Sequence, residues 1–174
     1  RLLVTDAARD PDRDFRSLLD APVAFVDARL AKLYGVTAPA AGFARVTLDP
    51  GSPRGGLLSL GAFLYGHARP VSSSPTLRGK FVRERLLCQG VDAPPTNVVP
   101  SLPPVDPDTP VTTRQRHEAH MSLGSCSGCH KLMDPLWFAF EHFDATGAYR
   151  ATEAGLPLDS TGTLDGVAFD GAAS

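Results

Sequence analysis

The sequence predicts a mainly α, loop-rich fold with a few short strands. Apolar residues recur at helical spacing over several segments, for example at Val23, Val26 and Leu30. Sixteen glycines and sixteen prolines among the 174 residues interrupt these segments, so we expect short helices joined by irregular chain. A hydrophobic fraction of 43% is ordinary for a packed globular core.

The first third of the chain is expected to contain helices and one strand. Residues 11–35 predict one or two helices, with Asp20 as an N-cap and Gly35 as the C-terminal stop. The run over residues 43–48 is typical of a short strand. A further helix is expected over residues 56–66.

The clearest helix signal begins at Ser74. Ser74 suits the N-cap, Pro75 suits the first helical position, and Gly90 would end the segment. Residues 92–111 hold seven prolines and show no helical period. We expect that stretch to run extended, partly in the polyproline conformation.

The last third predicts two more helices followed by small strands. Thr112 or Thr113 would cap the first of these helices. Pro135 would begin the second, with Asp134 as its N-cap. From Tyr149 onward the composition is typical of turns and short strands.

Charge and hydropathy exclude two classes of partner. Lysine and arginine number 17 against 19 aspartates and glutamates, so no basic excess points to nucleic acid. No apolar run reaches the ~18–20 residues that a membrane span needs. The N-terminus lacks the residue order of a signal peptide, and we expect the chain to be a mature or excised part of a longer polypeptide.

One motif carries recognisable chemistry. Residues 126–130 read Cys-Ser-Gly-Cys-His, the C-x-x-C-H sequence to which c-type haem is attached. On one helical turn, Cys126 and Cys129 can each form a thioether with a vinyl group of the same porphyrin. His130 can then bind the iron as an axial ligand. The sequence therefore predicts one covalently attached haem c.

Other sites also use C-x-x-C pairs. A zinc site needs a second pair of ligands, which here only Cys88 and scattered histidines can supply. A thioredoxin-like redox pair needs a βαβ setting, against which the Pro-rich chain before the motif argues. Cys88 is expected to be a buried residue on its helix, or in an exported protein to pair with another chain.

A porphyrin also needs apolar surroundings and partners for its carboxylates. Aromatic residues gather just after the motif, from Trp137 to Tyr149. We expect some of the following to contact the ring: Leu132, Leu136, Phe140 and Phe143. Arg78 or Lys80 would pair with a haem propionate, or would instead form a solvated helix face.

The residues leave the second axial ligand open. The candidates are His67, His117, His120, His142, Met121 and Met133, or no ligand at all. His120 and Met121 precede Cys126 by enough extended chain to pass round a haem edge. His67 would reach over from across the fold, whereas Met133 lies too close to His130 in sequence.

Several segments of the chain resemble one known family. Residues 54–58 (Arg-Gly-Gly-Leu-Leu), 74–82 and 126–135 closely resemble the planctomycete-type cytochrome c-like proteins. These are large, multidomain, exported proteins whose modules mostly have no assigned function. The resemblance implies a cytochrome c-like helical haem domain that takes part in electron transfer. In the family pattern a histidine precedes the haem cysteines, and it matches His120, which becomes the first candidate for the second iron ligand beside His130.

The resemblance also divides the chain. Residues 1–40 are expected to be the helical tail of a preceding module, residues 41–150 the haem-binding module, and residues 151–174 the start of a C-terminal module. Thioether assembly follows export in the organisms that this case resembles, which implies a periplasmic or extracellular location. The expected partner is a redox protein or another haem module, within a larger polypeptide or complex.

The expected function is one-electron transfer, an electron carrier more than an enzyme. One alternative is a peroxidase-like enzyme with an open iron site, near which Arg116, His117 or His120 would act. Another is an interaction module in which the haem is structural. Iron coordination distinguishes the first two.

Overall fold

The fold mixes helices with small sheets. The computed structural model describes residues 1–12, 14–94, 96, 102, 106 and 108–172. Over these residues 41% are helical and 15% lie in strands or bridges, and the strands form three two-stranded antiparallel sheets. The prediction of a mainly α, cytochrome c-like helical fold is therefore wrong, and the fold is α+β.

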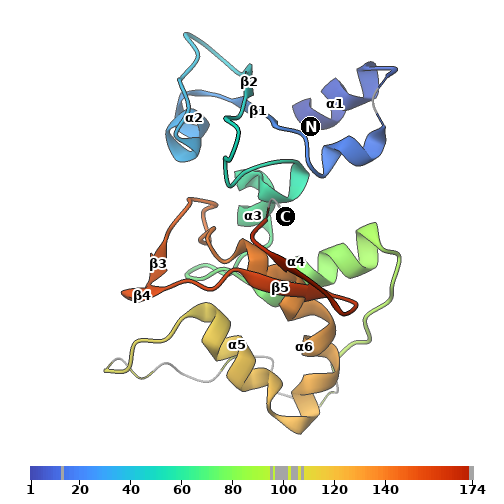
Figure 1. Ribbon diagram of the computed structural model, residues 1–174, viewed down its shortest axis with the longest axis vertical. Helices are drawn as coiled ribbons and strands as arrows, with labels where there is room; N and C mark the ends of the chain where they lie inside the picture. Colours follow the sequence, from blue (N-terminus) through green and yellow to red (C-terminus); the bar gives the residue numbers. More distant parts are fainter. Residues whose placement is uncertain (13, 95, 97–101, 103–105, 107, 173–174) are drawn as a thin grey trace.

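The N-terminal elements occupy the top of Figure 1, in blue and cyan. They are α1 (Leu2–Arg9), the 3-10 helix η1 (Phe15–Leu18), β1 (Val23–Val26), α2 (Ala28–Tyr34) and β2 (Ala44–Thr47). β1 pairs antiparallel with β2, so that Val23 lies opposite Thr47 and Val26 opposite Ala44. The strand predicted over residues 43–48 is thus confirmed.

β1 replaces part of the helix that was predicted over residues 11–35. Val23, Ala24 and Val26 are all buried, so this short run has no polar face and its periodicity does not distinguish strand from helix. Pairing with β2 decides the outcome. The pair also joins residues on both sides of the boundary expected at residue 40, and the module boundaries stay predictions.

α2 begins and ends by local chemistry. Asp27, rather than the predicted Asp20, is the N-cap, and its side chain accepts hydrogen bonds from the backbone N–H groups of Arg29 and Leu30. Gly35 ends the helix in the left-handed conformation at φ 70°, as predicted.

The middle of the chain is helical. It comprises η2 (Leu57–Ser59), α3 (Gly61–Gly66), α4 (Pro75–Phe81) and the π-helical turn η3 (Val82–Leu86). Ser74 caps α4 by accepting from the N–H of Leu77, and Pro75 opens the helix, as predicted. The helix ends before Gly90. Cys88 lies beyond it, is exposed and has a positive φ of 55°, so the prediction that it is buried on the helix is wrong.

Two helices carry the C-x-x-C-H motif and the residues just before it. α5 (Thr113–Met121) begins at Thr112, one of the two predicted caps, and Gln115 completes a capping box with it. α6 (Gly124–Trp137) continues into the 3-10 turn η4 (Phe138–Phe140). Pro135 lies inside α6 instead of starting a new helix, and Asp134 is no N-cap. A proline removes only one helical hydrogen bond, and contacts of α6 with α4, α5 and β5 hold the helix together around it.

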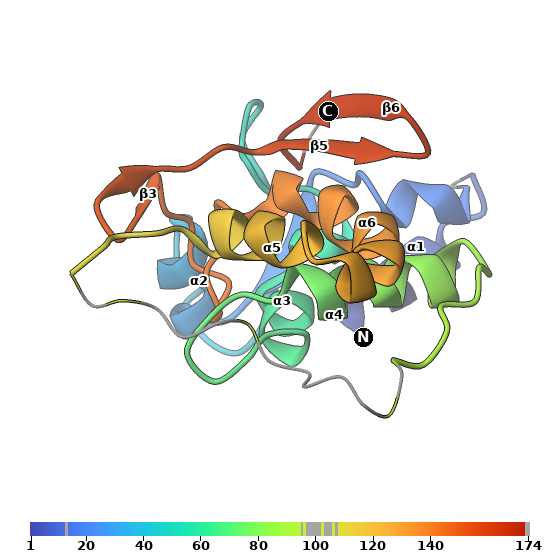
Figure 2. The same ribbon diagram turned by 90° about the horizontal axis from the view of Figure 1, so that it is seen from below.

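Two β-hairpins complete the chain. β3 (Thr152–Glu153) pairs with β4 (Leu156–Pro157), and β5 (Thr161–Leu164) pairs with β6 (Val167–Asp170). Both two-residue turns have positive φ at both positions, Ala154-Gly155 and Asp165-Gly166, which suits the twist of a tight hairpin. Figure 2 shows β5 and β6 lying across α6, and the small strands predicted after Tyr149 are confirmed.

α4 and α6 cross at very short range. A Cβ on Gly79 of α4 would overlap the backbone carbonyl of Met133 in α6, so only glycine permits this approach. Beside the crossing lies a buried apolar cluster of Leu64, Val82, Leu136, Trp137 and Phe143. This cluster is the core that holds the motif-bearing helix in place.

Two further expectations concern the loops and the membrane. Half of the Pro-rich run over residues 92–111, which was expected to be extended, lies outside the described residues, including 97–101 and 103–105. In the described part of the chain, no helix has the length and apolar character of a membrane span.

Glu141 is a buried carboxyl in this core. It accepts a hydrogen bond of 3.0 Å from the Ser73 hydroxyl, and its Oε2 lies 3.7 Å from the Arg150 guanidinium. Its side chain is 0% exposed, and burial raises the pKa of Glu141 to about 7, although the charge of Arg78 opposes this shift. The folded protein therefore holds this proton more tightly than the unfolded chain does.

Replacing Gly79 with alanine should separate α4 from α6. We expect Gly79→Ala to lower the free energy of unfolding by about 1–3 kcal/mol, the usual cost of overpacking. Gly66→Ala is the matched control, because a Cβ there meets nothing within 4 Å. Chemical denaturation measures both variants, and equal stability of the two would contradict the proposed contact.

Glu141 should make stability depend on pH. Its contribution is fully present below pH 4.5, the ordinary pKa, and is lost as the pH rises through about 7. Between pH 5 and pH 8 we expect a loss on the order of 1–3 kcal/mol that Glu141→Gln removes. The partly exposed Glu118→Gln is the control and should keep the wild-type profile. A Glu141→Gln profile parallel to that of wild type would contradict the assignment.

Candidate functional site

The C-x-x-C-H motif at residues 126–130 lies on α6, with its cysteines and histidine on one face. Cys126, Cys129 and His130 stand at positions i, i+3 and i+4, which share a face of a helix. Both cysteine side chains are half-buried, and the His130 side chain is 21% exposed. The three groups that the sequence assigned to one haem therefore point to the same side of one helix.

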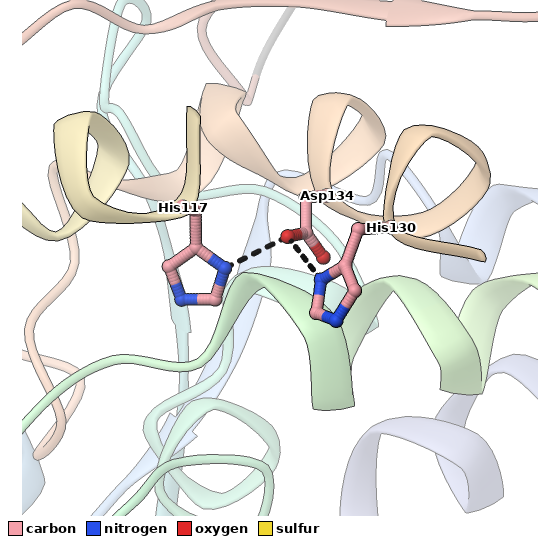
Figure 3. A group of neighbouring side chains, drawn as sticks. All are labelled: His117, His130 and Asp134. Carbon is pink, nitrogen blue, oxygen red and sulfur yellow. Dashed lines mark hydrogen bonds and ion pairs between the residues drawn. The ribbon is translucent and has the colours of Figure 1, made fainter. Parts of the chain in front are cut away.

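Asp134 lies one turn after His130 and binds two histidines with one oxygen. Its Oδ2 is 2.8 Å from Nδ1 of His130 and 2.7 Å from Nδ1 of His117, which α5 supplies (Figure 3). A carboxylate only accepts hydrogen bonds, so both Nδ1 atoms carry hydrogen. The Nε2 atom of each ring lies on the side away from Asp134 (Figure 3).

The Asp134 carboxylate is ionised in spite of its burial. Its side chain is 0% exposed, which by itself favours the neutral acid. The hydrogen bonds from His117 and His130 outweigh burial and hold the pKa of Asp134 below its usual value. Thr76 of α4 completes the group, with its hydroxyl 3.5 Å from Nδ1 of His117 and 3.4 Å from Nδ1 of His130.

His120 touches the motif histidine directly. Its ring meets that of His130 edge to face, with 4.6 Å between the ring centres. Burial, together with the charges of His130 and His117, lowers the pKa of His120. Among the described residues its buried Nδ1 has no hydrogen-bond partner. Two imidazoles on opposite sides of one metal ion would have ring centres about 6 Å apart, so His120 would have to shift if both rings were to bind one metal.

The other candidates for a second iron ligand have other partners. The His67 ring stacks on Phe63 at 4.3 Å, and its Nδ1 lies 2.9 Å from the Phe63 carbonyl oxygen. His142 stacks on Tyr149, with 5.3 Å between ring centres. Met133 is buried at the α4–α6 crossing, and Met121 is half-buried at the end of α5. Neither His67 nor His142 is among the described ring contacts of His130, which involve His117 and His120.

The apolar residues predicted to line the porphyrin divide into two groups. Leu136 and Phe143 belong to the buried core cluster, and Phe140 packs against it with its ring stacked 4.1 Å from Trp137. Leu132 is 49% exposed. The first three therefore have a structural role beside α4, whereas Leu132 lies at the surface of the motif helix.

Arg78 is engaged by backbone carbonyls. Its guanidinium donates to the carbonyl oxygens of Leu64 at 3.0 Å, Asp144 at 3.2 Å and Phe143 at 3.4 Å, and the side chain is 0% exposed. Burial lowers the pKa of Arg78 to about 10, so it stays charged at neutral pH. These contacts connect α4 with the chain that follows η4. Arg78, which the sequence predicted as a partner of a haem propionate, therefore stabilises the fold.

Arg54, in the segment Arg-Gly-Gly, makes a second buried tie of this kind. Its guanidinium donates to the carbonyl oxygens of Ser59 at 2.7 Å and of Gly147. It also lies over the rings of Tyr34 and Phe143, 4.3 and 4.6 Å from their centres. Arg54 thus connects the N-terminal elements with the loop beyond α6.

One group of side chains has metal-ligand geometry. In the part of the chain that the structure describes, His117, His130 and Asp134 are the only three such residues with ligand atoms all within 4.8 Å of one another. Cys126 and Cys129 do not belong to it. The hydrogen bonds already account for how these three residues lie.

Sequence reasoning missed the role of Asp134. Its position before Pro135 predicted a helix cap, whereas its spacing from His130, four residues on one helix, was the signal for a side-chain pair. His117 was one of several candidate ligands, and only the packing of α5 on α6 brings it to Asp134.

Comparison with known proteins assigns the family. Residues 54–153, more than half of the chain, match the family model PSCyt3, described as "Protein of unknown function (DUF1588)". The chain belongs to this family. PSCyt3 is a planctomycete cytochrome-like domain family of unknown function. The comparisons with curated proteins and with solved structures gave no match.

The matched PSCyt3 region contains the buried arginine contacts and the helix crossing described above. It begins at Arg54 and ends at Glu153, and so includes α4, α5 and α6. Several motif residues have a structural explanation here, because Arg54 and Arg78 bind backbone carbonyls and Gly79 permits the helix crossing.

Arg78→Lys should destabilise the fold without altering a bound cofactor. A lysine keeps the charge but cannot span three carbonyls, so we expect a loss of about 2–4 kcal/mol in chemical denaturation. Lys80→Met is the control, because Lys80 is 39% exposed and its ammonium contacts Glu84 at 2.8 Å and the Val91 carbonyl oxygen at 3.5 Å, contacts of small value near the surface. Unchanged stability with an altered haem spectrum would instead favour a propionate contact for Arg78.

Proposed function

We propose that this chain is a c-type haem protein that transfers single electrons within an exported redox assembly. Cys126 and Cys129 would hold one haem c through thioethers, and His130 would bind its iron. The observation that carries the proposal is the C-x-x-C-H motif on one face of α6, with Nδ1 of its histidine bound to Asp134. This arrangement leaves Nε2 of His130 as the ring nitrogen for iron.

The donor set fits such a group. A thioether-bound haem needs two accessible thiols and an imidazole on one side of a helix, and Cys126, Cys129 and His130 meet that requirement. Metal-bound histidines usually donate their other N–H to a carboxylate or a carbonyl, as His130 does to Asp134. When bound, the haem supplies an iron that alternates between the ferric and ferrous states.

The surroundings of the motif suit exchange of electrons at a surface. The two cysteines are only half-buried, and Leu123 and Leu132 on either side of them are each 49% exposed. Apolar surface beside a cofactor favours docking of a partner, here a redox protein or another haem module. Because covalent attachment follows export, we propose a periplasmic or extracellular location.

A second candidate function has one observation in its favour. The ring centres of His120 and His130 are too close for iron to lie between them. If His120 stays where it is, the iron has an open position, as a peroxidase-like enzyme requires. Coordination of the iron therefore decides between carrier and enzyme.

Absorption spectra of the matured protein test the proposal. The whole chain, exported in a host that attaches haem c, should carry one haem that survives denaturation. Oxidised and dithionite-reduced spectra should both be low-spin, as expected for two axial ligands. The double variant Cys126→Ala, Cys129→Ala should lose the haem, whereas the exposed Cys88→Ala should keep it.

Two results would count against electron transfer. A chain without covalent haem would overturn the proposal entirely. A high-spin spectrum with normal attachment would support the open-site enzyme instead, and turnover of peroxide would then be the next measurement.

A further inference from the structure

We propose that Asp134 is a positioning residue that sets the reduction potential of the iron, and that His117 weakens this effect by competing for the same carboxylate oxygen. The inference rests on the proposed function, since it concerns how His130 would bind iron. It adds a control on the potential that lies outside the C-x-x-C-H motif. Its evidence is the shared contact of Oδ2 with two imidazoles.

Asp134 determines which nitrogen of His130 faces the iron. The 2.8 Å contact requires hydrogen on Nδ1, so the lone pair of the neutral ring is on Nε2. A spacing of four residues on α6 and complete burial of the carboxylate fix this orientation. A carboxylate partner also makes the imidazole a stronger electron donor to a metal than a neutral acceptor does. Stronger donation stabilises ferric over ferrous iron and therefore lowers the potential.

His117 reduces the effect of Asp134 on the potential. Its Nδ1 donates to the same Oδ2 at 2.7 Å, slightly shorter than the bond from His130. One oxygen that accepts two N–H groups interacts more weakly with each of them. Oδ1 of Asp134 is buried and has no partner among the described residues, so the second oxygen does not relieve the competition.

The position of His117 suits such a modulating role. It comes from α5, a separate helix, and its side chain is 6% exposed. Its ring centre lies 6.3 Å from that of His130, and Thr76 stands near both Nδ1 atoms. The packing of α5 against α6 therefore controls how strongly Asp134 accepts the hydrogen bond from His130.

Two substitutions should move the potential in opposite directions. Asp134→Asn replaces the carboxylate with a neutral, weaker acceptor and should raise the midpoint potential. His117→Leu leaves Asp134 to His130 alone and should lower it. Redox titration of the haem-loaded chain, followed by its absorption bands, measures both. His142→Leu is the matched control, because His142 donates to the Arg150 carbonyl and should leave the potential unchanged.

The opposite signs separate this inference from a structural role. If Asp134 and His117 merely held the helices together, both variants would shift the potential in the same direction, and that result would overturn the inference. Equal potentials in all variants would also overturn it. If Asp134→Asn fails to fold, an unchanged or raised potential in His117→Leu still refutes the competition. A wild-type chain without haem would instead refute the proposed function, and the inference with it.

Discussion

The backbones of α4 and α6 touch where Gly79 faces the carbonyl of Met133, and much of the structure depends on this contact. It places Thr76 beside the two histidines on one side of α4 and Arg78 among backbone carbonyls on another. It also lets Val82, Leu136 and Trp137 close one apolar cluster. Side chains of ordinary size would keep the helices several ångströms further apart.

Buried charge has two different uses around this crossing. Arg54 and Arg78 donate hydrogen bonds to backbone carbonyl oxygens, and in this way they connect segments that are distant in sequence. Asp134 accepts hydrogen bonds from two imidazoles. The bond from His130, the candidate ligand, fixes the ring hydrogen on its Nδ1. In both cases burial is tolerated because the charged group has partners, which an isolated buried charge lacks.

Local rules predicted the elements that are held by local interactions. Thr112, Ser74 and Gly35 cap or end their helices as expected, because caps depend on a few neighbouring residues. The same rules failed at Val23–Val26, which is a strand only because β2 lies beside it. They failed again at Pro135, since contacts from three other elements keep α6 continuous through it.

By itself, the sequence determined the family resemblance, the motif at residues 126–130 and the placing of its three groups on one side of a helix, because a spacing of three and four residues is a property of any helix. Only the tertiary structure decided that the fold is α+β, that Asp134 binds two histidines and that Arg78 serves the core. Apart from the Asp134–His130 pair, which is four residues apart on α6, these features join residues that are 14 to 66 positions apart or that pair across strands. Such contacts depend on how the helices pack, and no local pattern encodes them.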